Sequence, residues 1–157
     1  MTGYPKGFYT LLLATLFVLP LTGVLLTPTL LALTLGWDVP WRLAYDGRVL
    51  VAVAHVVASF ITFSLIGAMW AIHMRRGWTL RRNRISGATL LGLFALLGLS
   101  GTGIYYFGGE LSSAIASLSH TALGYIAVIG FTVHFLRGRK SKAAGFAAPL
   151  VPSQIQN

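Results

Sequence analysis

The sequence predicts an all-α membrane protein, a bundle of four transmembrane helices, and three observations support this class. Hydrophobic residues make up 55% of the 157 residues and charged residues only 10%, too few to cover a soluble surface. Stretches without charge, such as 7–36 and 49–72, exceed the roughly 20 apolar residues that span a bilayer core. Basic residues gather in only some of the connecting segments. The net charge of +9 therefore reflects membrane topology and requires no nucleic acid as a partner.

The first expected helix covers residues 8–35, which is long for a single span. Proline removes an intrahelical hydrogen bond and clashes with the preceding turn, so Pro20 should kink this helix and Pro28 should end or bend it again. No small-residue cleavage site follows a short apolar core. We therefore expect a retained helix rather than a signal peptide.

Three further helices are expected at residues 48–74, 85–107 and 113–136. They complete a four-helix transmembrane domain over residues 1–142. The tail, residues 143–157, is rich in Ala, Pro, Ser and Gln and is expected to be loosely ordered.

The placement of charge predicts the orientation. The segment between the second and third helices and the C-terminal end are strongly basic, whereas charges cancel in the first connection and the last carries only Glu110. By the positive-inside tendency, both termini and the middle connection face the cytoplasm. The second and fourth helices then run in the same direction, from outside to inside. A bacterial inner membrane is the expected location.

All four histidines lie in two of the expected helices, His55 and His73 in the second and His120 and His134 in the fourth. The 18 residues from His55 to His73 make five turns and about 27 Å of rise, and the 14 residues from His120 to His134 make nearly four turns and about 21 Å. Each helix thus carries two imidazoles on nearly one face. If the two helices sit diagonally in the bundle, His55 pairs with His120 in the outer half and His73 with His134 at the inner end.

A flat cofactor whose metal is open above and below fits between two such imidazoles, and haem is such a cofactor. The chain has no cysteine, which excludes covalent haem attachment, thiolate iron–sulfur clusters and disulfides. Two haems b are therefore expected. Zinc and copper fit poorly, since they need three or four converging ligands and only two histidines share each depth. A proton relay is disfavoured because the last three helices contain no Asp or Glu.

Arginines near the histidines agree with this interpretation. Arg75, Arg76 and Arg137 follow the inner histidines within a turn, where they could pair with anionic propionates. Arg48 lies seven residues before His55 on the same face and could serve the outer haem. The alternative is that these arginines are topology signals only.

Small residues recur at the same depths. Gly87 and Gly101 are 14 residues apart on the third helix, one at each depth, where a porphyrin edge would approach the backbone. Gly23 and Gly124 could act similarly, although glycines in membrane helices more often serve helix packing. Ser59, one turn after His55, could accept from an imidazole, but a bond to its own backbone is the commoner role.

Both two-helix halves end with His-x-x-Arg-Gly, at residues 73–77 and 134–138. With Ser100-Gly101-Thr102-Gly103 to Tyr106 and His120-x-x-x-Gly124, the chain up to residue 142 resembles the four-helix di-haem membrane cytochrome b family. That family includes membrane subunits of formate dehydrogenases and nickel–iron hydrogenases. The paired histidines also resemble the haem-binding bundle of cytochrome b in quinol–cytochrome c oxidoreductases.

This resemblance and the histidine pairs imply transmembrane electron transfer between an extracytoplasmic redox partner and a quinone pool or an inner-face partner. The chain is expected to be the membrane subunit of a larger redox complex, without catalytic residues of its own. Two alternatives stay open. One is a quinone reductase or quinol oxidase acting alone, and the other is a cofactor-free structural subunit of a membrane complex.

Overall fold

The computed structural model describes residues 4–81 and 83–146, and all regular structure in this part of the chain is helical. The elements are α1 (Phe8–Leu35), α2 (Tyr45–Met69), the π-helix η1 (Trp70–Met74), α3 (Arg75–Thr79), α4 (Arg84–Tyr106) and α5 (Glu110–Phe146). In the described part of the chain, α1, α2, α4 and α5 as far as Lys140 are long and apolar enough to cross a membrane. The predictions of an all-α chain and of four helices able to span a membrane are confirmed.

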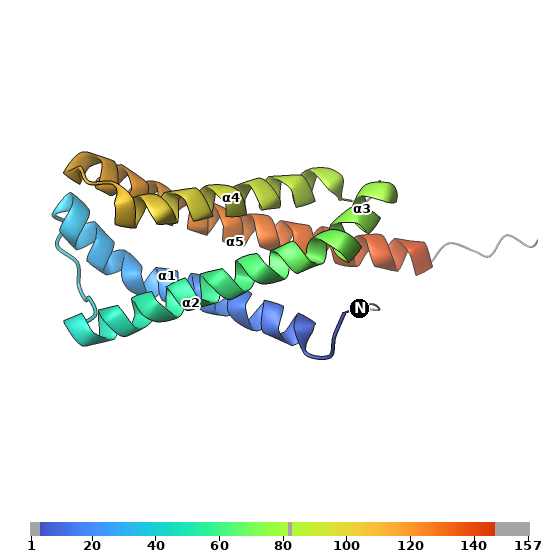
Figure 1. The fold of residues 1–157 in the computed structure, drawn as a ribbon, viewed down its shortest axis with the longest axis horizontal. Helices are drawn as coiled ribbons and strands as arrows, with labels where there is room; N and C mark the ends of the chain where they lie inside the picture. Colours follow the sequence, from blue (N-terminus) through green and yellow to red (C-terminus); the bar gives the residue numbers. More distant parts are fainter. Residues whose placement is uncertain (1–3, 82, 147–157) are drawn as a thin grey trace, which may run out of the picture.

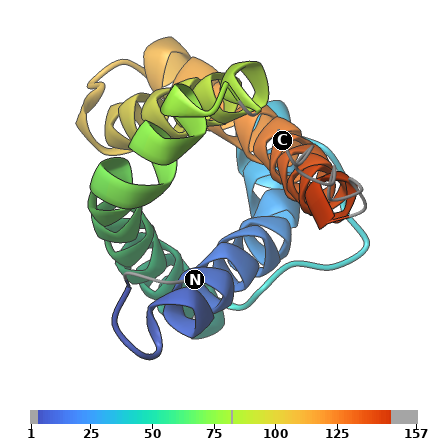
Figure 2. The same ribbon diagram turned by 90° about the vertical axis from the view of Figure 1, so that its right-hand side faces the viewer.

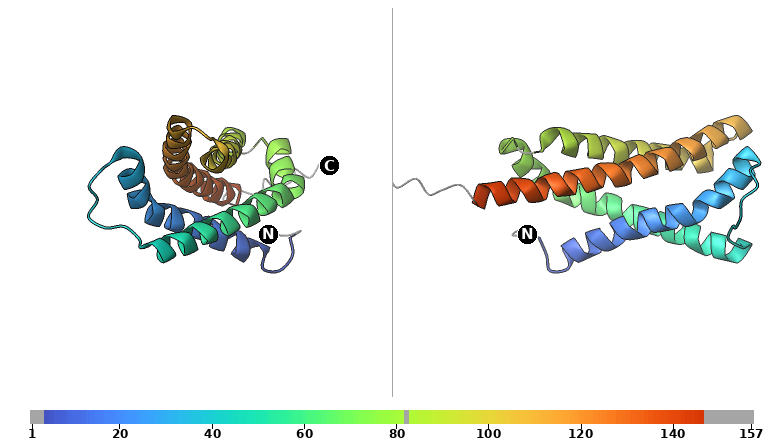
Figure 3. Two further views of the ribbon diagram at one scale, coloured as in Figure 1. Left: turned by 60° about the vertical axis from the view of Figure 1, so that its left-hand side comes forward. Right: turned by 180° about the vertical axis from the view of Figure 1, so that it is seen from behind.

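The four long helices form two antiparallel hairpins that lie side by side (Figure 1). α1 packs against α2, α4 packs against α5, and α1 also contacts α5. A view along the bundle shows α2 and α5 diagonally opposite, with α1 and α4 between them (Figure 2). Both hairpins turn at the same end of the bundle, so α2 and α5 run in the same direction (Figures 1 and 3). This is the arrangement that pairing of the histidines requires.

The bundle interior consists mainly of small side chains. Among the described residues, the buried hydrophobic ones are Leu12, Ala58, Ala116 and Ala127, and the buried polar ones are Thr15, Thr22, Thr29 and Thr62. Large apolar side chains lie on the outside instead, such as Leu33 at 66% exposure and Leu99 at 70%. Lipid is as apolar as leucine, so membrane helices associate through close backbone contact at small residues.

α1 remains one helix through both of its prolines, so it does not end at Pro28 as one prediction had it. Helix-breaking residues are tolerated in membrane spans because hydroxyl side chains help to satisfy the backbone. Thr27, directly before Pro28, donates its hydroxyl to the Gly23 carbonyl at 2.8 Å, next to the Val24 carbonyl that Pro28 leaves without an amide donor. The helix ends at Gly36, whose φ of 66° is a left-handed conformation that glycine adopts without strain.

The second span differs from the straight α-helix that was predicted. Its last turn, Trp70–Met74, is a π-helix that contains His73, and the helical path then continues through α3 to Thr79. A π-helix hydrogen-bonds from residue i to i+5 and therefore holds more residues per turn. The prediction of five whole α-turns between His55 and His73 is wrong for this reason.

The last helix is longer than predicted. α5 continues to Phe146, beyond the expected end at residue 136, because the Arg, Lys and Ala residues that follow are good helix formers. Residues 147–157 of the predicted tail lie outside the described residues.

Gly103 offers a test of this packing, because it is buried where α4 meets α5. A Cβ at Gly103 would lie 3.2 Å from the Cβ of Ala116 and 2.7 Å from Cε2 of Phe107. Gly103→Leu should therefore push the helices apart and lower the thermal unfolding temperature in detergent by roughly 2–10 °C. Gly92, also on α4, has nothing within 4 Å, so Gly92→Leu is the matched control and should not lower that temperature. Equal unfolding temperatures for the two variants would contradict this contact.

Candidate cofactor site

The structure brings the four histidines together as two pairs. The ring centroids of His55 and His120 lie 6.1 Å apart, and those of His73 and His134 lie 6.2 Å apart. The ring planes form an angle of 72° in both pairs. Each pair joins the second span to α5, the helix diagonally opposite it (Figure 2). The bundle therefore has one imidazole pair at each of two depths.

The ring separation suits two imidazoles on opposite sides of one metal ion. A metal–imidazole nitrogen bond is about 2.0–2.1 Å and the ring centroid lies about 1.1 Å behind the nitrogen, so two axial imidazoles have centroids about 6.2 Å apart. Both pairs have this separation although the sequence spacing is 18 residues in the second span and 14 in α5. The π-turn and the oblique course of α2 in the bundle compensate for the four additional residues between His55 and His73 (Figure 1).

In the outer pair, each imidazole donates through Nδ1 to a neighbouring helix. Nδ1 of His55 lies 2.7 Å from Oγ1 of Thr22, whose own hydrogen is donated to a carbonyl of α1 at 2.7 Å. Nδ1 of His120 lies 3.1 Å from the Leu97 carbonyl, which can only accept, and 3.1 Å from Oγ of Ser100. Both rings are therefore Nδ1–H tautomers, and the Nε2 lone pair is left for a ligand.

The inner pair repeats this pattern on α5. Nδ1 of His134 lies 3.1 Å from Oγ of Ser86, which donates to the Asn83 carbonyl at 3.2 Å. Its partner, His73, lies in the π-turn and is exposed, whereas the other three histidines are partly buried. Single π-turns are rare in proteins, and those that occur are often found at functional sites. Here the π-turn carries the inner ligand candidate from the second span.

Glycines face three of the four rings. A Cβ added at Gly23, Gly87 or Gly101 would lie 3.7, 3.6 or 3.2 Å from the Cε1 atom of an imidazole, a different one in each case. Gly124 has nothing within 4 Å, so it does not share this arrangement. The first three glycines let a neighbouring helix approach a ring closely, and any side chain at Gly101 would press on His120.

Sequence reasoning missed the hydroxyl residues that hold the rings. They occur as Ser/Thr-Gly dipeptides, Thr22-Gly23, Ser86-Gly87 and Ser100-Gly101, in which one residue accepts the hydrogen bond and the next leaves space for the ring. Recurrence of Ser-Gly at a 14-residue interval in one span is the signal that could have found them. Ser59 instead donates to the Val56 carbonyl at 2.7 Å.

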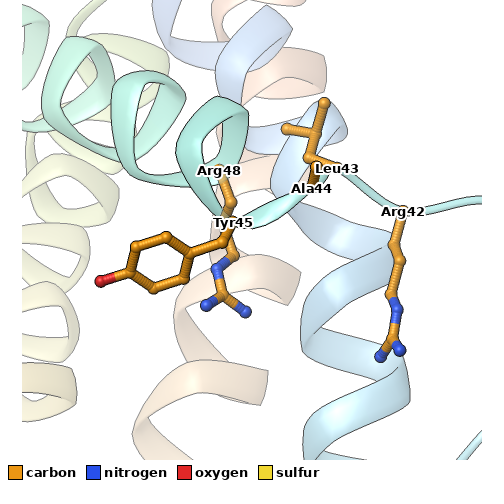
Figure 4. Close-up of a pocket in the computed structure, with 5 residues that line it drawn as sticks. All are labelled: Arg42, Leu43, Ala44, Tyr45 and Arg48. Atoms are coloured by element: carbon orange, nitrogen blue, oxygen red, sulfur yellow. The ribbon is translucent and has the colours of Figure 1, made fainter.

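At the hairpin end of the bundle, Arg48 lines a pocket of about 310 Å³ together with Arg42 and Tyr45. The two guanidinium groups point to the same side of the chain (Figure 4). The guanidinium carbon of Arg48 lies 5.4 Å from the centroid of the Tyr45 ring. This end of the bundle can therefore offer two positive charges to one anionic group.

The other three predicted arginines lie at the opposite end, and they have different surroundings. Arg75 and Arg76 begin α3 directly after the π-turn and are exposed. Arg137 lies along a groove between α4 and α5, of which Ser86 is also a part. The predicted role of Arg75, Arg76 and Arg137 beside the inner histidines therefore stays a prediction.

The donor set indicates what kind of metal could bind. Within residues 4–81 and 83–146, no three His, Cys, Asp or Glu side chains gather at one point. Two imidazole nitrogens in one pair suit a metal whose other ligands come from a planar cofactor, and they are fewer than the ligands of a tetrahedral zinc site.

No family model, curated protein or solved structure matches the chain.

The hydrogen bonds predict the tautomers of the histidines. With ¹⁵N-labelled histidine, NMR of the cofactor-free protein should show His134 protonated on Nδ1, and Ser86→Ala should shift that signal alone. Thr102→Ala is the matched control on α4, because this hydroxyl donates only to the Gly98 carbonyl. A proton on Nε2 of His134, or equal spectra for both variants, would contradict the arrangement.

Proposed function

We propose that the chain is a di-haem b-type cytochrome that carries electrons across a membrane. The main support is the presence of two imidazole pairs, with ring centroids 6.1 and 6.2 Å apart, between co-directional helices. Haem iron cycles between ferric and ferrous states, and two axial histidines favour electron transfer over oxygen chemistry. His55 and His120 would hold the outer haem, and His73 and His134 the inner one.

The residues around the ligands would orient them and tune their basicity. The hydroxyls of Thr22, Ser86 and Ser100 and the Leu97 carbonyl accept from Nδ1–H, which restrains rotation of each ring. The same hydrogen bonds make Nε2 a stronger electron donor toward a metal. Glycines beside the rings would let the bundle close around a flat group.

Cationic side chains would neutralise the haem propionates. Arg48 would serve the outer haem from the hairpin end of the bundle, and Arg75 and Arg76 would serve the inner haem from the start of α3. The predicted propionate role of Arg137 has less support, because this side chain lies along the α4–α5 groove.

The basic end of the bundle, with both termini, would face the cytoplasm of a bacterial inner membrane. Electrons would pass between an extracytoplasmic redox protein and a quinone or redox partner at the inner face. The exposure of His73 supports exchange at that face, since it places the inner site near the surface. The short connections between the long helices fit a membrane subunit of a larger complex.

Removing one ligand from each pair tests this function. His55→Ala and His73→Ala should each lose about half of the haem bound by the wild type, and each should lose a different component of a redox titration followed at the Soret band. Ser64→Ala is the control on α2, because its hydroxyl donates to the Phe60 carbonyl of its own helix. A wild-type protein without a Soret band, or variants with unchanged spectra, would reject the proposal.

The Nδ1 hydrogen bonds predict an effect on reduction potential. Ser86→Ala should raise the potential of the inner haem by about 20–60 mV, because losing one hydrogen bond makes the imidazole a weaker donor to ferric iron. Ser100→Ala should have a smaller effect on the outer haem, because the Leu97 carbonyl still accepts from His120. Redox potentiometry would measure both potentials. A lowered potential in Ser86→Ala would contradict this role.

A further inference from the structure

A groove of about 220 Å³ runs between α4 and α5 at the basic end of the bundle. Its walls are mainly apolar, and Ser86, Thr89 and Arg137 contribute the polar groups. Ile85, which also lines it, is 83% exposed, and Val133 is 39% exposed. In a membrane-spanning bundle such exposed apolar side chains face lipid. The groove is therefore accessible from the bilayer.

The groove lies where α5 presents a glycine, Gly130, to α4. Gly130 has no side chain, and a Cβ there would lie 3.5 Å from Cδ1 of Leu93 and 3.8 Å from Cδ1 of Leu90. A volume of 220 Å³ corresponds to about seven water molecules of about 30 Å³ each. A phosphate with part of a glycerol backbone fits such a volume, while acyl chains would continue along the apolar surface outside it.

The charge distribution of the chain leaves Arg137 without an acidic neighbour. The whole sequence holds only three acidic residues, Asp38, Asp46 and Glu110. Glu110 begins α5, 27 residues and about 40 Å of helix before Arg137. Asp38 and Asp46 belong to the α1–α2 connection and the start of α2, at the same distant end (Figure 1). No acidic side chain can therefore neutralise Arg137.

We infer that this groove binds one anionic phospholipid. The guanidinium of Arg137 would hold the phosphate through paired charge-assisted hydrogen bonds, as basic pockets between membrane helices do. The hydroxyl of Thr89 would donate to an ester or glycerol oxygen, and Leu90, Leu93 and Val133 would contact the acyl chain.

The groove is also connected to the inner histidine pair. Ser86 lines the groove and lies 3.1 Å from Nδ1 of His134. A phosphate in the groove would place a negative charge one side chain away from a metal ligand, where it stabilises the oxidised, more positive state. If the proposed haem function holds, the bound lipid therefore lowers the potential of the inner site and leaves the outer one unchanged.

Lipid retention tests the site without reference to haem. The full-length protein is placed in nanodiscs of phosphatidylcholine with a minor share of phosphatidylglycerol and released for native mass spectrometry. The wild type should retain one phosphatidylglycerol, and Arg137→Gln should retain it roughly tenfold less, as expected for loss of charge-assisted hydrogen bonds. Arg139→Gln is the matched control. It removes the same charge two residues after Arg137, and the Arg139 side chain does not line the groove. Arg137→Lys, which keeps the charge, should restore part of the retention.

Two outcomes would overturn the inference. One is equal loss of phosphatidylglycerol in Arg137→Gln and Arg139→Gln, which would mean that retention reflects net charge only. The other is a wild type that retains phosphatidylcholine, or a copurified quinone, in place of phosphatidylglycerol. If the protein binds no haem, the expected lipid retention is unchanged. Only the predicted difference in the reduction potential of the inner haem between phosphatidylglycerol and phosphatidylcholine nanodiscs would then be lost.

Discussion

An imidazole at membrane depth has two ring nitrogens to satisfy, and this requirement organises the bundle. An unpaired polar group in lipid costs several kcal/mol, roughly 2–7 in most reference scales. For His55, His120 and His134, a hydroxyl or carbonyl of the neighbouring helix accepts from Nδ1, so only Nε2 remains to be matched. Under the proposed function, fixing Nδ1 of each ring in this way leaves Nε2 as the atom that would bind the haem iron.

The rest of the fold follows from bringing these rings together. The acceptors must come from adjacent helices, so α1 serves His55 in one hairpin and α4 serves His120 and His134 in the other. Each hydroxyl acceptor is followed by a glycine, and the need for one is clearest at Gly101, where a Cβ would crowd the His120 ring at 3.2 Å. Among the described residues few large side chains are buried, so the histidine pairs are among the larger polar groups between the diagonal helices.

Much of this arrangement could be predicted from the sequence, because hydropathy, charge placement and histidine spacing are direct consequences of spanning a membrane. Four spans and an all-helical class were predicted from these features and are confirmed. The π-turn at Trp70–Met74 was not predicted, since nothing in its composition distinguishes it from an α-turn. The roles of Thr22, Ser86 and Ser100 also escaped, because a serine or threonine in a membrane helix ordinarily bonds to its own backbone, and these three do so as well.

Electron paramagnetic resonance of the oxidised protein is the most direct measurement of the central claim, that each imidazole pair clamps one haem iron. Two imidazoles whose ring planes form an angle of 72° would donate to different d orbitals of the iron, which would then be nearly equal in energy. The ferric signals should therefore be low-spin and strongly anisotropic. Spin counting should give two such irons for each chain. High-spin iron, a single low-spin iron for each chain, or a correctly folded protein without iron would contradict the account.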